Sequence, residues 1–578
     1  MTIIFVRRTE TFLANQHDDN AADDEHGLRE AIMAAPDNAI LHVRLGHLLF
    51  EKGDLAGTAG AYQTAARLNP GDWMTFYNLG VALARLGRHA DALAAQRQAL
   101  LHNPSSPEVL TQTGLLLHKS GDNEGALEML DKAVAAAPGQ FEAHYYRGIV
   151  LAAEERIAEA VAAQASAVCA SPSRFEGHLA IGKLLARLGR EDEALAAYHR
   201  AVESNPAALA AHEEFNNLAW EMGKDVRQLG SHAFARARIG ETPAFLLAEA
   251  ELLLRFRDAG EAAKAEALLA RAGDGAAIAS APIASAPIAS ARGRALLLQN
   301  RLAEAAAQFD RAIAGEPASI THRQNLAITL LRDGDAAAAR RVLDQALAMG
   351  AEDQLTLGLL TLAARALGDQ TWLGRMAVDD WAQEIAPPVP PGFSDMAAFN
   401  AALGEELTSL HTRTAAPMDQ SLNRGTQTPG NLFARKSRLL CLLEDSLRHA
   451  IAGYIAGLPE AAGHPFLARR RGGFDFSGSW SCRLNSSGYH TNHLHTKGWI
   501  SSAYYVDLPP EIGAGAGTEG ALKLGESPFA LGEDDRPSRI VTPAVGKLVL
   551  FPSYFWHGTV RFTANRPRLT VAFDVVPR

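Results

Sequence analysis

Cysteine is scarce in this chain of 578 residues, which has three, Cys169, Cys441 and Cys482, and no CxxC spacing. This excludes a disulfide framework and a thiolate zinc site, and it favours a reducing compartment. Basic charge is not in excess, since the formal net charge is −10, so we expect no nucleic-acid partner. No apolar run is long enough to span a bilayer, and the N-terminus lacks the apolar core of a signal peptide. We therefore expect a cytoplasmic protein without a membrane partner.

Several catalytic motifs are also missing. The chain has no Gly-rich phosphate loop, no GxSxG elbow and no HExxH helix, which excludes nucleotide hydrolysis, serine hydrolysis and zincin-type proteolysis. Hydrophobic residues make up 47% of the chain and charged residues 21%. That composition is typical of a folded protein with a substantial core.

An internal repeat runs through the first part of the chain. A proline recurs every 34 residues, a glycine recurs with the same period, and so does an alanine. The three series are Pro36, Pro70, Pro104, Pro138, Pro172 and Pro206; Gly46, Gly80, Gly114, Gly148 and Gly182; and Ala31, Ala65, Ala99, Ala133, Ala167 and Ala201. A second alanine recurs at Ala92, Ala126, Ala160 and Ala194, where the first repeat has Thr58.

Each of these positions has a physical role in a helical hairpin. Small residues are needed where two helices approach closely, and the proline ends the second helix. A single hairpin cannot bury its apolar face, so successive hairpins must stack. The pattern resembles the tetratricopeptide repeat, which implies a superhelix of roughly seven to nine hairpins with a groove for a peptide or protein, either the substrate or an adaptor.

Composition predicts the domain boundaries. We expect a leader over residues 1–26 and helical repeats over 27–375. Within the repeats, the low-complexity segment 276–290 has prolines five residues apart, which disfavour a helix and predict a mobile loop. A Pro-rich linker is expected over 376–393, followed by a second domain over 394–578.

The pattern of residue types in the last domain differs from that in the repeats. Helical stretches near Met396–Leu410 and Ser437–Gly457 are followed by short aromatic and β-branched runs, SWSCRL, WISSAYYVDLP, KLVLFPSY and RLTVAFDVV. Such strands between Gly/Pro turns predict a mainly-β domain of the jelly-roll kind.

Histidines cluster in this domain, in GYHTNHLHTKGW and FPSYFWHGT. On a strand, His493 and His495 share a face, and His490 points away from it unless the chain bends. Together with the distant His557, an HxH pair predicts a metal site, but imidazole suits iron, zinc, copper or nickel and does not select among them.

The C-terminal domain resembles the iron(II)/2-oxoglutarate oxygenases, specifically a bacterial group with tetratricopeptide repeats upstream. The resemblance covers about residues 415–578 and is carried by four segments, SLNRGTQTPGNLF, HPFL, GYHTNHLHTKGWISSAYYVDLP and GKLVLFPSYFWHGTVRFTANRPRLTVAFDVVP. It implies a double-stranded β-helix in which His493 and His557 bind Fe(II). It further implies 2-oxoglutarate as co-substrate, O2 as oxidant, and an arginine on a late strand that binds the co-substrate carboxylate.

Two arginines compete for that last role. Arg568 is the first choice, and Arg566 shares its face on a regular strand unless Pro567 breaks the regularity. A planar guanidinium suits the task because it pairs bidentately with a carboxylate. Tyr504 and Tyr505 alternate faces, so we expect one of them in the pocket and the other in the core.

The third metal ligand is left open by the sequence, because His495 stands where the familiar pattern has Asp or Glu. Three hypotheses follow: a three-histidine site with His495, a two-histidine site completed by water, or a carboxylate from elsewhere, such as Asp507 or Asp574. We favour His495. Ser501 and Ser502 are candidates for binding an oxygen of 2-oxoglutarate.

The sequence thus predicts a 2-oxoglutarate/Fe(II)-dependent dioxygenase, a hydroxylase whose peptide or protein substrate is positioned by the repeats. One alternative is a three-histidine metal dioxygenase that does not use 2-oxoglutarate. The other is a catalytically inactive scaffold built on the repeats.

Overall fold

The computed structural model describes residues 24–273, 282–350, 352–413, 415–418, 420–461, 463–513, 515, 517–533 and 535–578. Residues 1–23 of the expected leader and residues 276–281 of the low-complexity segment lie outside this range. The chain forms two compact units, one ending at His212 and the other beginning at Glu213.

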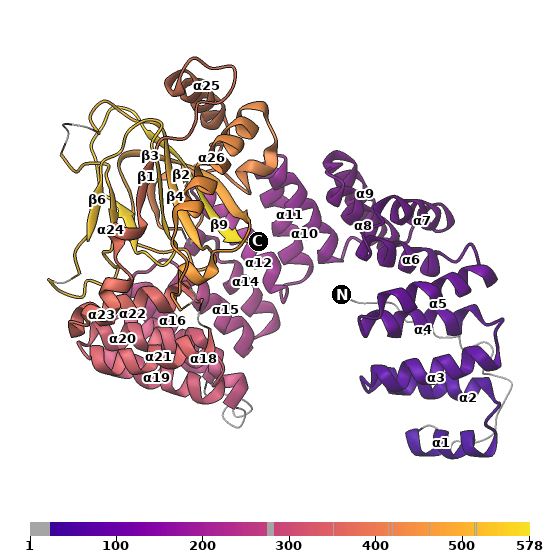
Figure 1. Ribbon diagram of the computed structural model, residues 1–578. Coiled ribbons are helices and arrows are strands. Elements are labelled where there is room, and N and C mark those ends of the chain that lie inside the picture. The colour runs from indigo at the N-terminus through magenta and orange to yellow at the C-terminus, as the bar shows by residue number, and fades with distance from the viewer. Residues whose placement is uncertain are drawn as a thin grey trace. The chain divides into compact units, whose positions relative to one another are not determined.

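The first unit consists of stacked helical hairpins, which Figure 1 shows in chain order. A half unit, α1 (Glu25–Ala34), precedes five full hairpins. These are α2 (Ala39–Glu51) with α3 (Leu55–Leu68), α4 (Trp73–Arg85) with α5 (His89–His102), α6 (Pro107–Lys119) with α7 (Asn123–Ala136), α8 (Phe141–Ala153) with α9 (Ile157–Ala170), and α10 (Phe175–Arg187) with α11 (Glu191–Ser204). The unit ends within α12 (Leu209–Glu221).

The repeated small residues lie where the two helices of a hairpin meet. A Cβ on Gly46 would lie 2.7 Å from a ring carbon of Tyr62, and one on Gly182 would lie 2.4 Å from the ring of Tyr198. The recurring alanines from Ala65 to Ala201 are at most 1% exposed. The prediction that these positions need small side chains is therefore confirmed.

A further periodic element was not recognised in the sequence. The imidazoles of His42, His144, His178 and His212 each hydrogen-bond the carbonyl oxygen of the repeat proline six residues earlier, at 2.8–3.0 Å between Nε2 and O. These histidines are separated by multiples of 34 residues. Each ties the start of one hairpin to the turn before it.

The second unit begins with more helices. They are α13 (Val226–Leu229), α14 (Ser231–Ile239), α15 (Pro243–Leu254), α16 (Ala259–Gly273), α18 (Pro282–Leu298), α19 (Leu302–Gly315), α20 (Ile320–Arg332), α21 (Ala336–Met349), α22 (Gln354–Leu367), α23 (Gln370–Arg375) and α24 (Val378–Trp381). Neighbouring helices again pack as hairpins, as α18 does with α19 and α20 with α21.

Part of the expected loop is helical. Helix α18 begins at Pro282 and contains Pro287, so the prediction of a mobile loop is wrong for residues 282–290. Pro282 is tolerated because it occupies the first helical position, where no N–H bond is needed. An interior proline costs about 3 kcal/mol, but Ile288 and Ala291 pack into a core with Leu269 of α16, and this burial offsets the cost.

Two antiparallel sheets form the C-terminal part of this unit, the orange and yellow ribbons of Figure 1. The six-stranded sheet has the order β1-β7-β4-β9-β3-β2, and the three-stranded sheet has the order β6-β5-β8. Their bounds are β1 (Gln383–Ile385), β2 (Leu422–Gln427), β3 (Phe474–His490), β4 (Ile500–Asp507), β5 (Leu522–Leu524), β6 (Arg539–Val541), β7 (Leu548–Pro552), β8 (His557–Thr559) and β9 (Arg568–Pro577).

Helices and short turns accompany the sheets. They are α25 (Met396–Ser409), α26 (Arg438–Gly457), η2 (Leu432–Arg435) and η3 (Leu467–Arg469). Both helices and the long strands agree with the sequence prediction. Trp499, Phe551 and Phe573 are fully buried in the core. Helical repeats followed by an antiparallel, sheet-rich domain consistent with a jelly roll are therefore confirmed as the fold class.

The expected linker 376–393 belongs to the second unit. Its strand β1 pairs with β7 in the large sheet, and the carbonyl of Pro388 accepts a hydrogen bond from Ser446 Oγ of α26 at 2.6 Å. The helices from Glu213 onward form one compact unit with the sheets. An extended, Pro-rich segment suits an edge strand as well as a spacer. Among the described residues, none of the helices combines the length and apolar character needed to cross a membrane.

Candidate metal centre

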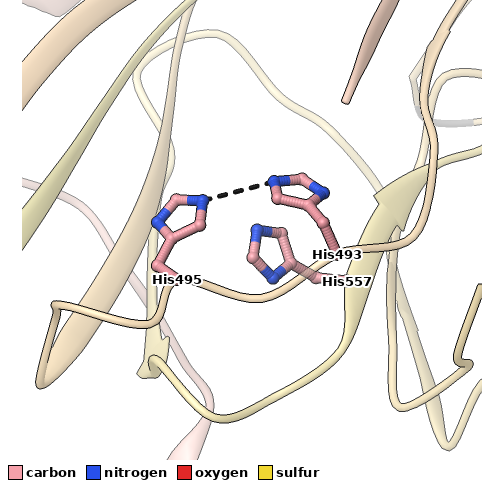
Figure 2. Close-up of side chains that lie close together, drawn as sticks. All are labelled: His493, His495 and His557. Atoms are coloured by element: carbon pink, nitrogen blue, oxygen red, sulfur yellow. Dashed lines mark hydrogen bonds between the residues drawn. The ribbon is translucent and has the colours of Figure 1, made fainter. Parts of the chain in front are cut away.

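Three imidazoles converge at one end of the sheets. Figure 2 shows His493, His495 and His557 turned toward one another, and one ligand nitrogen from each lies within 4.8 Å of the others. Within the described residues, no other cluster of histidine, cysteine, aspartate or glutamate has metal-binding geometry. The distant His557 thus joins the HxH pair, as the sequence predicts.

Backbone hydrogen bonds bring the two segments together. The N–H of His493 donates to the carbonyl of His557 at 2.9 Å, and the N–H of His557 donates back at 2.8 Å. The N–H of His495 donates to the carbonyl of Ser553 at 3.2 Å. These bonds pair the stretch after β3 with the stretch around the start of β8, so residues far apart in sequence share one site.

Each imidazole is oriented through its Nδ1 atom. Nδ1 of His493 lies 2.8 Å from the Thr491 carbonyl, and Nδ1 of His557 lies 2.9 Å from the Phe555 carbonyl. Nδ1 of His495 lies 2.5 Å from Oδ1 of Asp574. Because these oxygens accept hydrogen bonds, each Nδ1 carries the proton and each Nε2 keeps its lone pair.

The resulting donor set fits a metal ion. Nε2 of His493 and Nε2 of His495 are 3.2 Å apart (dashed line in Figure 2), and two lone pairs at that distance repel unless a cation lies between them. Two nitrogens at about 2.1 Å from one ion and at right angles would be separated by about 3 Å. Nδ1 bonds to carbonyl and carboxylate oxygens are typical of metal-bound histidines.

Burial keeps His493, His557 and the neighbouring His490 neutral. It lowers the pKa of His493 to about 3, with the nearby His495 adding to the effect. The pKa values of His490 and His557 also lie well below the usual range, again mainly because of burial. Neutral imidazoles are the form that binds a metal, so no proton need be displaced at neutral pH.

The two carboxylates that were considered as alternative ligands have other partners. Asp574 lies behind His495, where Oδ1 also accepts a hydrogen bond from Ser501 Oγ at 2.7 Å. Asp507 forms an ion pair with Arg566. The structure therefore brings Asp574 to the back of a candidate ligand and does not bring Asp507 to the histidines.

Arg568 and Arg566 differ in environment. Arg568 is 3% exposed, its guanidinium lies 5.1 Å from the ring centroid of Tyr505, and its Nε has no hydrogen-bond partner among the described residues. Arg566 is exposed and binds both Asp507 and the carbonyl of Leu508. A buried guanidinium with an unused N–H is suited to an anionic ligand.

The other predicted residues fall on two faces of β4. Tyr505 is fully buried beside Arg568, whereas Tyr504 donates its hydroxyl hydrogen to Asn400 of α25 at 2.8 Å. Ser502 Oγ donates to the Phe573 carbonyl at 2.8 Å, and Ser501 faces His495 at 3.1 Å from Nδ1. Tyr505 and Ser501 therefore face the site, and Tyr504 and Ser502 face the packed side.

Small side chains separate the histidines from Arg568. Along β9, Asp574, Ala572, Thr570 and Arg568 alternate onto one face, with Asp574 beside His495. Ala572 is only half-buried, although its neighbours Val571 and Phe573 are fully buried. Ala572 is thus the partly accessible position on this face between the triad and the arginine.

Further rings pack around the triad. The ring of Trp480 lies 5.6 Å from that of His495, and the ring of Phe551 lies 4.8 Å from that of His557. The chain bends after β3, so the ring of His490 stacks 5.9 Å from that of His493. Alternation along β9 was the available signal for Asp574, because it places Asp574 on the face of Arg568.

A cavity of about 400 Å³ adjoins the site at Trp480. Its lining combines polar and apolar groups and comes from the loop around Thr428 and Asn431, from Ser477 and Ser479 of β3, and from Arg413. Arg413 is paired with Glu221 at 2.8 Å. A substrate in this cavity would contact the tryptophan that packs on a candidate ligand.

Comparison with known families agrees with this arrangement. The family model described as "Putative 2OG-Fe(II) oxygenase" matches residues 478–574, and tetratricopeptide repeat models match residues 43–108, 111–175 and 175–207. The chain carries tetratricopeptide repeats and a C-terminal oxygenase-family domain. The matched part of the oxygenase-family domain includes the three histidines, Asp574 and Arg568.

Several solved structures are similar to parts of this chain. YrrB, titled a TPR protein with an unusual peptide-binding site, is 21% identical, with 33% of this chain and 98% of that chain covered and a TM-score of 0.28. A tetratricopeptide repeat protein from Parabacteroides merdae is 18% identical, with 50% of this chain and 98% of that chain covered and a TM-score of 0.32. Yeast Tom70 is 15% identical, with 60% of this chain and 92% of that chain covered and a TM-score of 0.34. No curated protein matched the chain.

Proposed function

We propose that the oxygenase-family domain is an Fe(II)- and 2-oxoglutarate-dependent dioxygenase that hydroxylates a peptide or protein. The observation that carries the proposal is the orientation of the three histidines. Each Nδ1 is hydrogen-bonded to an oxygen acceptor, which leaves Nε2 as the ligand atom, and one ligand nitrogen from each ring lies within 4.8 Å of the others. Nε2 of His493 also lies 3.2 Å from Ser421 Oγ. When bound, the iron and its co-substrate would supply the activation of O2 that C–H hydroxylation requires.

His495 is the third metal ligand in this proposal, beside His493 and His557. The support is that Asp574 binds the far side of His495 and is thereby held away from the metal position. A neutral third donor leaves the iron more positive than a carboxylate would, which favours an anionic co-substrate. The negative charge of Asp574 reaches the metal only through the imidazole.

Arg568 binds the distal carboxylate of 2-oxoglutarate in this proposal. Its burial, its unused Nε–H and its position on the face that leads to the triad support that role. Tyr505 forms the wall beside it. The half-buried Ala503 and Ala572 leave space on the sheet for the chain of the co-substrate.

The substrate is a peptide or protein side chain that enters through the cavity beside Trp480. Stacked helical repeats commonly bind peptides or proteins, and a tethered binding surface raises the effective concentration of the substrate at the catalytic domain. The polar groups that line the cavity, among them Arg413 and Asn431, offer hydrogen bonds to such a chain. Three free cysteines and the absence of disulfides among the described residues agree with the cytoplasm as its compartment.

The proposal is tested by adding Fe(II) and then 2-oxoglutarate to the full-length protein without oxygen. We expect the visible charge-transfer band of an iron-bound keto acid in the wild type. Arg568→Ala should lose the band at co-substrate concentrations that saturate the wild type. Arg566→Ala is the matched control, because Arg566 already pairs with Asp507, and it should keep the band.

Each outcome distinguishes the alternatives. An iron-loaded, folded wild type without the band, and without succinate when oxygen is admitted, would favour a three-histidine dioxygenase that does not use 2-oxoglutarate. A protein that binds no iron at all would favour the inactive scaffold. Equal loss of the band in both arginine variants would contradict the assignment of Arg568.

A further inference from the structure

Helix α22 contacts both segments that carry the candidate metal ligands. The carbonyl oxygen of Gly358 accepts a hydrogen bond from Trp556 Nε1 at 3.2 Å, and Trp556 directly precedes His557. A Cβ on Gly358 would lie 2.7 Å from Cδ2 of Leu494, the residue between His493 and His495. One glycine of this helix therefore touches the neighbours of all three histidines.

A second anchor lies two turns further along the same helix. Arg365 donates from Nη1 to the carbonyl of Gly525 at 2.5 Å and from Nη2 to Ser538 Oγ at 2.6 Å. The N–H of Gly525 in turn donates to the carbonyl of Trp556 at 2.6 Å. Trp556 is thus linked to α22 through its indole, and also through its backbone by way of Gly525.

The first ligand segment is tied into the same network. The side-chain amide of Asn492, which precedes His493, donates to Glu526 Oε2 at 2.9 Å and to the carbonyl of Ser527 at 3.0 Å. Glu526 directly follows Gly525. Residues 525–527 therefore hydrogen-bond both the segment before His493 and the segment before His557, and Arg365 of α22 binds Gly525 in the same stretch.

Helix α22 is rigidly placed. Leu357, Leu359 and Leu360 are fully buried and belong to the same core as Phe551 and Trp556. A cavity of about 270 Å³ lies between this helix and the segment before His557, because Thr361, Leu362 and Arg365 of α22 line it together with Phe555 and Trp556. The close contact between the helix and this segment is therefore the one at Gly358.

We propose that Gly358 is a positioning residue for the metal centre. Its missing side chain lets α22 lie directly against Leu494 and Trp556, and this contact fixes the spacing of the three imidazoles. Helix α22 lies outside residues 478–574, the part that the oxygenase family model matches. Metal binding therefore depends on a helix that precedes the sheets. The inference rests on the proposed function only in taking the triad as a metal site.

Gly358→Ala tests this idea directly. The new methyl group would lie within 2.7–3.2 Å of Leu494 Cδ2, the Tyr554 carbonyl and Trp556 Nε1, so one or both ligand segments must shift. Alanine is the better helix former, so the helix itself is not weakened. Gly453→Ala is the matched control, because Gly453 lies inside α26 with no atom within 4 Å of its Cβ position.

The measurement is an anaerobic titration of the full-length protein with Co(II), followed by the visible ligand-field spectrum. We expect wild type and Gly453→Ala to bind equally, and Gly358→Ala to bind roughly tenfold or more weakly, with an altered spectrum. Circular dichroism and thermal melting report whether the variant is folded. Wild-type affinity with a wild-type spectrum in Gly358→Ala would overturn the proposal.

Two further variants keep the test decisive if Gly358→Ala folds poorly. Trp556→Phe removes the indole N–H that donates a hydrogen bond to the Gly358 carbonyl, and it keeps an aromatic ring in place. This variant should therefore also weaken Co(II) binding. Leu494→Ala makes room for the added methyl group, so Gly358→Ala should cost less affinity in that background than alone. Independent, additive effects would contradict the contact. A wild type that binds no Co(II) would overturn both this proposal and the metal centre itself.

Discussion

Replacing Asp574 by alanine is expected to weaken metal binding without unfolding the domain. Oδ1 of Asp574 accepts hydrogen bonds from Nδ1 of His495 at 2.5 Å and from Ser501 Oγ at 2.7 Å. Without the carboxylate, His495 loses the acceptor that holds its proton on Nδ1. The ring then also adopts the tautomer with the proton on Nε2, and a protonated Nε2 cannot bind the metal.

The structure sets the size of the effect. Loss of a hydrogen-bond partner behind a metal-bound histidine costs about 10–100-fold in affinity, or about 1.4–2.7 kcal/mol. Ser501 Oγ lies 3.1 Å from the same Nδ1 and remains as a weaker acceptor. We therefore expect a loss near tenfold for Asp574→Ala and near a hundredfold when Ser501→Ala is added. Asp574→Asn keeps an acceptor oxygen without the charge and should lie between wild type and Asp574→Ala.

Anaerobic titration with Fe(II) or Co(II) measures these affinities. Asp475→Ala is the control, because Asp475 accepts hydrogen bonds from the exposed Arg578 at the start of β3 in the same sheet. Its affinity should equal that of the wild type. The reasoning is refuted if Asp574→Ala binds within twofold of the wild type, or if adding Ser501→Ala changes nothing.

Two predictions concern stability. Burial, with a contribution from a nearby arginine, lowers the pKa of His411 to about 4. Between pH 6.5 and 4 the unfolded chain therefore takes up a proton at His411 that the folded chain does not. The free energy of unfolding falls as the pH is lowered through this range. His411→Gln should make the loss of urea resistance between pH 7 and 5 shallower, by up to about 1.4 kcal/mol per pH unit; an unchanged slope would contradict the assignment. Gly182→Ala places a methyl group 2.4 Å from the Tyr198 ring and should destabilise the first unit by about 1–3 kcal/mol in thermal unfolding. Gly60→Ala, with open space around it, should be neutral or stabilising, and equal melting of the two variants would refute the packing argument.

Local patterns in the sequence were sufficient for the repeats and for most of the ligand set. A period of 34 residues, with glycine and alanine where helices touch, fixes the hairpins because close packing depends on side-chain size at each position. The HxH pair and His557, the first residue of β8, were found from local histidine motifs, whereas Arg568 was implied by the family resemblance and compared with Arg566 by strand alternation. The histidine-to-proline bonds of the repeats obey the same period and were visible in principle.

Contacts between distant segments were decided by the tertiary structure. The partner of His495 is 79 residues away, at Asp574, and nothing local distinguishes a carboxylate that binds a metal from one that binds a histidine. Arg566 and Arg568 share a face in the sequence pattern, and only the folded structure separates them, because Arg566 is exposed and paired with Asp507 whereas Arg568 is buried. Helix α18 forms despite Pro287 because burial against α16 outweighs its low local propensity. The approach of Gly358 to Trp556 joins residues 198 positions apart, and such a contact exists only once both surfaces have folded.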